Sequence, residues 1–284
     1  VPESRDPSSA PIDFAGAALA VVSLASLVFG LTEAARRHAG SAVVWAPLAA
    51  GIAAAAAFVV RESRAAHPML PLELFRSRAF SAANAFTLLL YAGLGAALFF
   101  VPFELIQARG ESPTRAGASL LPFVAEMSAL SRLTGRLGGR IGPRLPLAGG
   151  AITTAVGLAL FLILPPAAGF AAAVLLPIAI LGLGMTLAVP TLTAAVMGSA
   201  DPKHAGIVSA FNNAVSRLGG LLAIAALTIA VAGTPGAFSA PDSRGFRIAM
   251  GGAAVLALSA AVLAVLAFPA GKPRRHRAAN PPGG

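Results

Sequence analysis

The stretch RLTGRLGGRIGPR, residues 132–144, separates two long apolar runs. It holds four arginines and four glycines in thirteen positions. Apolar runs of about twenty residues are long enough to cross a bilayer, and positive charge holds a connecting segment at one membrane face. Glycines let the ends of two helices approach closely. The stretch therefore predicts a tight loop between two membrane-spanning helices.

Composition assigns the class of the whole chain. The 284 residues are 57% hydrophobic and only 11% charged, and the mean hydropathy is +0.80. Soluble domains are about a quarter charged, so we expect a polytopic membrane protein embedded in a lipid bilayer. The net charge of +10 is distributed between the apolar runs, which favours a role in topology over nucleic-acid binding. Cysteine is absent, which excludes disulfides and thiol chemistry.

Eight apolar runs predict about eight transmembrane helices, an all-α fold. A helix of about twenty residues rises about 30 Å, the thickness of the hydrocarbon core. The run at 113–133 differs from the others because it contains Arg115, Glu126 and Arg132. The eight runs are 14–32, 42–60, 80–103, 113–133, 145–165, 170–197, 206–232 and 246–268.

The distribution of basic residues predicts the orientation. With eight crossings, both termini lie on one side of the membrane. Fourteen Lys and Arg residues fall in segments on that side and six on the other, while Arg217 falls inside a helix. Cytoplasmic segments are enriched in Lys and Arg, so both termini and the 132–144 segment are predicted to be cytoplasmic.

One face of the run at 206–232 is polar. Its polar and small residues follow helical spacing. Arg217 lies about 16 Å along this helix from its start, and a charge near the bilayer centre costs about 2.5–3.5 kcal/mol. Two interpretations remain: the face lines a substrate cavity or domain interface, or it forms structural hydrogen bonds while Arg217 snorkels. The face comprises Ser209, Asn212, Asn213, Ser216, Arg217 and Gly220.

Glu126 is a second candidate site residue. A carboxylate in low dielectric favours its protonated form, as proton coupling requires. The alternatives are a static partner for Arg217 or another polar group, and a misplaced helix boundary. In the run at 80–103, Asn84, Thr87 and Tyr91 are spaced i, i+3 and i+7. They form either a cavity stripe or a packing face.

The pattern of reactive residues argues against an enzyme. All four histidines, at positions 38, 67, 204 and 276, fall in connecting or terminal segments. The apolar runs offer no His, Cys or Asp pair for a metal or a nucleophile with its base. We therefore predict no catalytic residue, no metal site and no cofactor.

Several motifs resemble a known family. GRLGGRIGPR at 135–144 looks like the loop between the second and third helices of a major facilitator superfamily half. PTLTAAVMGSADPKHAGIVSAFNNAVSRLGG at 190–220 is similar to the fourteen-helix drug:proton antiporter branch. The same branch is resembled by VPESRDP at 1–7 with Ile12 and Asp13, by HPMLPLELFR at 67–76 and by FELIQ at 103–107.

The resemblance implies a domain plan. Members of that branch have six helices, two linking helices and six more, and this chain aligns with the linking pair and the second six. The first six, which carry the antiporter signature, are the missing amino-terminal half. The implied parts are a cytoplasmic segment at 1–13, two linking transmembrane helices at 14–60, a cytoplasmic surface segment at 61–79, the six-helix transporter bundle at 80–268, and a basic cytoplasmic tail at 269–284.

The resemblance also implies a role for the arginine-rich segment. In the family this loop helps to lock one conformation through a charge interaction, and an acidic residue stands where this chain has Gly139. The conformational residues carried over to this sequence are Gly135, Arg136, Gly139, Arg140, Gly142 and Arg144.

The expected function is part of a secondary active exporter, which exchanges protons for drugs or other amphipathic small molecules by alternating access. The expected transport cavity or coupling residues are Glu126, Asn212, Asn213, Ser216, Arg217, Asn84 and Tyr91. The alternative is a transport-incompetent membrane remnant or interaction partner, which needs another chain to supply its missing first half.

Overall fold

Every regular element that the structure describes is a helix. The computed structural model describes residues 13–36, 41–65, 71–201, 204–231 and 243–271. The long helices are α1 Phe14–Arg36, α2 Ala42–Glu62, α3 Arg78–Gln107, α5 Leu121–Ile141, α6 Arg144–Ile163, α7 Leu176–Met197, α8 Ala205–Val231 and α9 Arg244–Ala267. The short elements are η1 Leu72–Arg76, α4 Pro113–Ala118, η2 Pro166–Ala168 and the π-helical turn η3 Ala171–Leu175, which leads into α7. The all-α prediction is confirmed.

Seven of these helices are long and apolar enough to span a membrane: α1, α2, α3, α6, α8, α9, and α7 together with its π-helical turn. The protein is therefore a multi-pass membrane protein. The run predicted at 113–133 is the exception: the chain breaks between α4 and α5, and α5, although long enough, is not apolar enough to be counted as a span. Helix α5 carries Glu126, Arg132, Arg136 and Arg140, and only its Gly138 is buried. Those charges lower its hydropathy below that of a typical lipid-facing span.

The tight loop predicted at 132–144 is wrong for most of its length. Helix α5 continues to Ile141 and α6 begins at Arg144, so that only Gly142 and Pro143 connect them. Arginine and leucine are good helix formers, and the four-residue spacing of the arginines places them on one solvated face. Gly142 adopts φ +88°, a conformation that suits glycine and ends the helix.

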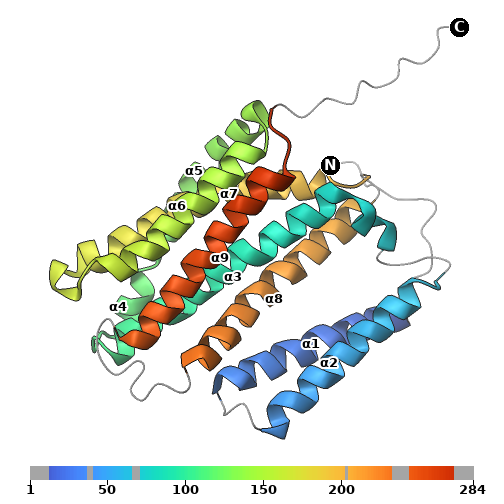
Figure 1. Cartoon of the computed structure of the whole chain (residues 1–284), viewed down its shortest axis with the longest axis horizontal. Coiled ribbons are helices and arrows are strands. Elements are labelled where there is room, and N and C mark those ends of the chain that lie inside the picture. The colour runs from blue at the N-terminus through green and yellow to red at the C-terminus, as the bar shows by residue number, and fades with distance from the viewer. Residues whose placement is uncertain (1–12, 37–40, 66–70, 202–203, 232–242, 272–284) are drawn as a thin grey trace, which may run out of the picture.

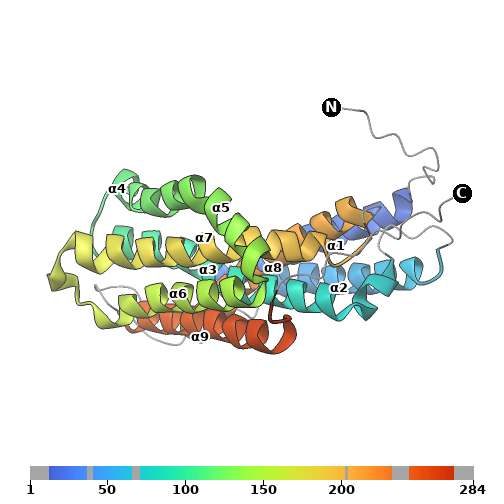
Figure 2. The same ribbon diagram turned by 90° about the horizontal axis from the view of Figure 1, so that it is seen from above.

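Helix α6 packs between α7 and α9, and α3 packs against α8 and α9. Helix α5 lies on α7, and the α1–α2 hairpin meets the bundle through α1 and α8. Figure 1 shows this hairpin beside α8, and Figure 2 shows α4 and α5 along one side of the bundle. Helices α5 and α8 thus lie at the edge of the bundle, and α1 contacts α8 from outside.

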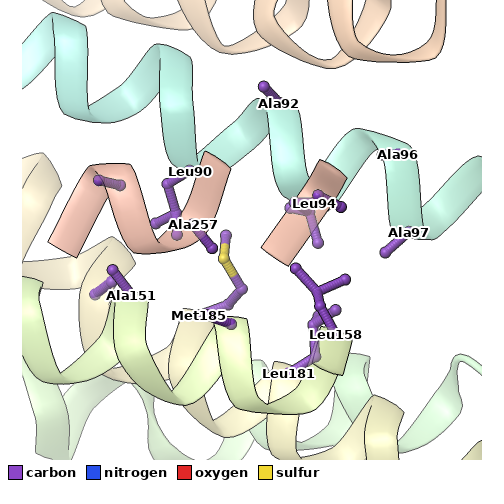
Figure 3. Close-up of a cluster of buried hydrophobic side chains, with 14 of the residues drawn as sticks. Leu90, Ala92, Leu94, Ala96, Ala97, Ala151, Leu158, Leu181, Met185 and Ala257 are labelled. Atoms are coloured by element: carbon purple, nitrogen blue, oxygen red, sulfur yellow. The ribbon is translucent and has the colours of Figure 1, made fainter. Parts of the chain in front are cut away.

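The core of the bundle is built mainly from alanine and leucine. Figure 3 shows Leu90 of α3, Ala151 and Leu158 of α6, Met185 of α7 and Ala257 of α9 meeting at its centre. Each of these side chains is almost fully buried. Small residues let helix backbones approach closely, which is the main source of packing energy between helices in a bilayer.

Helix directions sort the arginines between the two ends of the molecule. Asp13 and Arg61 join the start of α1 to the end of α2, with Arg61 Nη2 2.6 Å from Asp13 Oδ1. Gly142, after α5, lies against Gly271, after α9. At the opposite end Arg247 Nη1 donates to the Leu162 carbonyl at 3.3 Å. Among the described residues, Arg136, Arg140 and Arg144 therefore share one end, as the alternation of crossings predicts.

Candidate functional site

A groove of about 760 Å³ lies between α1, α3 and α8. Its volume falls within the range of small-molecule sites, about 300–1,000 Å³. Helix α1 contributes one side chain, and α3 and α8 form the two long walls. The groove is lined by Val28, Tyr91, Leu94, Gly95, Leu98, Phe99, Asn213, Ser216, Arg217, Gly220, Leu221 and Ile224.

The polar side of the groove comes mainly from the predicted stripe on α8. Asn213, Ser216 and Arg217 all line it, and Tyr91 of α3 joins them. Asn213 and Arg217 are exposed, while Ser216 is half-buried and donates a hydrogen bond to the Asn213 carbonyl at 2.8 Å. Arg217 is the only Asp, Glu, Lys or Arg in this lining. The groove therefore carries one positive charge on an otherwise apolar or neutral surface.

Two glycines bring α3 and α8 into backbone contact within the groove. A methyl group built on Gly95 would overlap the Cα atom of Gly220, and one on Gly219 would lie 2.7 Å from the Leu88 carbonyl oxygen. The stripe on α8 already included Gly220, but nothing in the sequence paired it with Gly95. This close approach fixes the helix crossing that holds Tyr91 and Arg217 in the same groove.

Asn84 and Asn212, both expected in the transport cavity, bond to each other between α3 and α8. Asn212 Nδ2 donates to Asn84 Oδ1 at 3.0 Å and to Thr87 Oγ1 at 2.7 Å. Asn84 and Thr87 are buried and in turn donate to the Phe80 and Ala83 carbonyls. This network, which we call the α3–α8 clamp, joins the two helices through the side chains of Asn84, Thr87 and Asn212. Neither asparagine lines the groove.

Glu126 faces α7 rather than the groove. A methyl group built on Gly182 of α7 would overlap Glu126 Oε2, so the glycine makes room for the carboxylate. That oxygen is buried and has no hydrogen-bond partner among the described residues. One turn further along α7, the Thr186 hydroxyl is also buried without a partner, and its carbonyl accepts a 2.7 Å hydrogen bond from Thr134 Oγ1. A pairing of Glu126 with Arg217, one of the alternatives left open by the sequence, is not formed among the described residues.

The arginine-rich segment lies on an exposed face of α5. Arg132, Arg136 and Arg140 are exposed, and Arg144, the first residue of α6, is half-buried. Gly138 packs against the Thr191 side chain of α7, whereas nothing lies within 4 Å of the place where a side chain on Gly139 would begin. An acidic residue at Gly139 would thus fit sterically.

The remaining conformational residues sit at the helix end. A methyl group built on Gly135 would lie 3.4 Å from the Cβ atom of Pro190 in α7. Gly142 lies against the backbone of Gly271. The chain that leaves α9 thus rests on the α5–α6 turn, a contact that no sequence pattern indicated.

The sequence also missed the apolar side of the groove. Leu94, Leu98 and Phe99 of α3 line it together with Val28 of α1 and Ile224 of α8. Their periodicity is the same as that of residues facing lipid, so no local signal separates the two groups. Among the residues that the structure describes, no group of three or more His, Cys, Asp or Glu side chains is placed to hold a metal ion.

Comparison with known proteins finds a family match and several relatives. Residues 12–224 match the family model of the Major Facilitator Superfamily. The chain is 32% identical over 232 residues to the tetracenomycin C resistance and export protein of Streptomyces glaucescens, covering 82% of this chain and 43% of that protein. It is 32% identical over 263 residues to the lincomycin resistance protein of Streptomyces lincolnensis, covering 91% of this chain and 53% of that one.

A third relative is the cephamycin export protein CmcT of Amycolatopsis lactamdurans, which is 30% identical over 265 residues, or 92% of this chain and 54% of the relative. The chain therefore spans about half the length of the curated relatives it matches. The predicted resemblance to the superfamily is confirmed.

Proposed function

This chain belongs to the major facilitator superfamily, and on that premise we propose that it forms the carboxyl-terminal part of a proton-coupled exporter of amphipathic small molecules. The observation that carries the proposal is the match to resistance and export proteins over most of this chain. Two helices followed by a helical bundle also fit the linking pair and second half of the fourteen-helix branch. Both termini are proposed to be cytoplasmic.

An amino-terminal six-helix half is the proposed partner. Among the helices of the bundle, α5 and α8 bury the least of their surface. They also carry polar groups, including Arg132 and Arg136 on α5 and Asn213 and Arg217 on α8. Charges inside a membrane face protein or water rather than lipid. We infer that the missing half covers this side of the bundle and that a water-accessible pathway runs between the halves.

Within this proposal the groove and Glu126 have separate roles. The groove contacts the cargo through Tyr91, Asn213, Ser216 and Arg217. Glu126 exchanges protons, because one oxygen of its half-buried carboxylate lies buried against α7 without a hydrogen-bond partner among the described residues. Asn84 and Asn212 act structurally, since the clamp uses their side chains. Alternating access would then move α5 against α7 as Glu126 changes charge.

The test is an efflux assay in a bacterium that lacks its own drug exporters. The chain is expressed alone, together with a six-helix amino-terminal half taken from a relative, and fused to that half. Fluorescent and antibiotic substrates are then loaded and their loss followed. We expect efflux only when both halves are present. Absence of efflux from every combination, with both halves folded in the membrane, would refute the proposal.

The alternative is a remnant or interaction partner that transports nothing. The only observation that favours it is that the chain matches about half the length of its relatives. An in-frame sequence upstream of Val1 that encodes six helices supports the exporter. A stop codon at that place, combined with failure of the assay above, supports the remnant.

A further inference from the structure

We propose that the groove between α1, α3 and α8 selects amphipathic ligands that carry an acidic group, and that the acid binds the Arg217 guanidinium. The inference deepens the proposed export function, because it names the chemical class of the cargo. It rests on three features of the groove: its charge, its unpaired donors and its apolar wall.

The charge of the groove favours an anion. Arg217 is the only Asp, Glu, Lys or Arg side chain that lines it. No carboxylate among the described residues forms an ion pair or a hydrogen bond with this guanidinium. An arginine held within a membrane protein gains most from a planar, bidentate acceptor such as a carboxylate. A ligand acid would supply that acceptor.

Two further hydrogen-bond donors line the same groove as Arg217. The Tyr91 hydroxyl has no hydrogen bond to any residue that the structure describes, and Tyr91 lines the same groove. The Asn213 side chain is exposed there as well. Both groups can donate to the second oxygen of a carboxylate, which accepts several hydrogen bonds when ionised.

The apolar residues of the groove favour a ligand that has an apolar body. Leu94, Leu98 and Phe99 line the groove from α3, and Val28 and Ile224 line it from α1 and α8. Leu98 is 38% exposed and Phe99 is 41% exposed, so both present their side chains to a ligand. A small inorganic anion would leave these side chains uncovered, whereas an acid with an aromatic or aliphatic body would cover them.

The same geometry disfavours a cationic ligand. Glu126, a half-buried carboxylate of α5, packs on Gly182 of α7 and is not part of the groove. A cation in the groove would meet Arg217 without any acidic side chain to offset the repulsion. We therefore expect preference for an acid over its neutral ester, and over an amine of the same shape.

The test measures probe binding to the purified chain in nanodiscs of neutral phosphatidylcholine. The probes are an anthroyloxy-labelled fatty acid, its methyl ester, and the corresponding primary amine. Empty nanodiscs give the partitioning background. We expect the acid to bind at least about tenfold more tightly than the ester or the amine, a difference of about 1.4 kcal/mol.

Variants assign that preference to the groove. Arg217→Ala should remove it, and Arg217→Lys should keep only part of it, because the charge remains but the bidentate geometry is lost. Arg136→Ala is the matched control, since Arg136 is an exposed arginine on α5 outside the groove. Leu98→Trp places a larger side chain on the apolar side of the groove, so it should weaken the binding of the acid and of the ester to the same extent. Each variant is first checked for an unchanged elution profile and melting temperature.

Two outcomes would overturn the inference: equal binding of acid and ester, or acid binding that Arg217→Ala and Leu98→Trp leave unchanged. Adding phosphatidylglycerol to the nanodiscs tests whether the acidic group that binds Arg217 belongs to a lipid headgroup or to a cargo molecule. Arg217-dependent competition by this lipid would assign the groove to a lipid headgroup and overturn the cargo role, and no competition supports that role. Because binding is measured without transport, loss of efflux with intact acid selectivity would refute only the proposed export function.

Discussion

At the scale of single residues, the polar stripe of α8 is divided between two tasks. Asn212 and Asn213 are neighbours in sequence, and successive residues of an α-helix point about 100° apart. Asn212 therefore reaches α3 and joins the α3–α8 clamp, while Asn213 lines the groove. The stripe thus contains a residue that bonds to α3 and residues that line the groove, and only the latter belong to the proposed ligand site.

The clamp predicts unequal effects of two neighbouring substitutions. Asn212→Ala removes both hydrogen bonds to Asn84 and Thr87 and leaves buried acceptors unpaired. We expect a loss of about 0.5–2 kcal/mol in the free energy of unfolding. Asn213→Ala, at an exposed position, should cost less than about 0.5 kcal/mol. Unfolding in mixed micelles measures both, and equal losses would contradict the assignment.

Glu126 predicts a pH effect on transport. In a complete transporter, Glu126→Gln fixes the side chain in a neutral form, so proton exchange at this position stops. One pH unit changes the occupancy of a titrating group by up to about tenfold. We expect efflux driven by a proton gradient to vary less than about twofold between pH 6 and 8 in the variant.

The control for that experiment is Glu73→Gln, because Glu73 is an exposed carboxylate in η1. It should keep the pH dependence of the unmodified transporter. If the Glu126 variant also keeps that dependence, Glu126 takes no part in coupling.

At the scale of helices, glycines decide which pairs come close. Gly95 and Gly220 let α3 and α8 touch, Gly138 lets α5 approach Thr191 of α7, and Gly182 makes room for Glu126. In a bilayer the hydrophobic effect does not drive helices together, and small residues at these crossings instead allow close van der Waals packing. The groove lies beside the α3–α8 crossing, and α1 adds Val28 to its lining.

The α3–α8 crossing gives an asymmetric prediction. Gly95→Ala would place a methyl group on the Gly220 Cα atom, whereas the nearest atom to a methyl on Gly220 is 3.5 Å away. We expect the first change to cost about 1–3 kcal/mol by overpacking and the second to be nearly neutral. Thermal unfolding of the two variants decides this, and comparable stability would contradict the observed helix separation.

The hairpin of α1 and α2 gives a prediction that depends on pH. Asp13 accepts a 2.6 Å hydrogen bond from Arg61, which with the Gly16 backbone N–H lowers its pKa from 3.8 to about 2. A lowered pKa in the folded state stabilises the protein above the unfolded pKa, and this contribution is lost as the pH falls toward 2.

We therefore expect Asp13→Asn to lower the melting temperature by a constant amount above about pH 5, and by progressively less below about pH 4. Trp45, the single tryptophan, lies on α2 and reports this transition by fluorescence. A difference that grows as the pH falls would mean that Asp13 is not paired with Arg61 in the folded protein.

At the scale of the whole molecule, the faces differ in what covers them. Helix α9 presents Val255, Val262 and Leu266, which suit lipid chains. Helices α5 and α8 present arginines and an asparagine instead. A bilayer surrounds the first face at little cost, while the second needs water or protein. This difference supports a second half that docks on α5 and α8.

Single-cysteine labelling tests that division, because the chain contains no cysteine. Asn213→Cys and Arg136→Cys should react with a water-soluble maleimide in nanodiscs, whereas Val262→Cys should remain unlabelled. We expect at least about a tenfold difference in rate, since the thiolate reacts only where water reaches it. If Asn213→Cys is as unreactive as Val262→Cys, the wet pathway on α8 is refuted.

The sequence by itself determined the class of the protein, most of its spans and its family. Long apolar runs have only one stable form in a bilayer, the helix, so their lengths and the charges between them fix the spans. The motifs at 135–144 and 190–220 carried the family resemblance. The stripe on α8 was recognised because helical spacing is a local property.

The tertiary structure alone decided how the polar residues divide. Local spacing cannot show that Asn212 bonds to Asn84, that Gly95 meets Gly220, or that Glu126 faces Gly182 rather than Arg217. Nor did it show that the arginine-rich segment is helical to Ile141. These features depend on which helix lies opposite, and contacts between residues far apart in sequence arise only when the bundle packs.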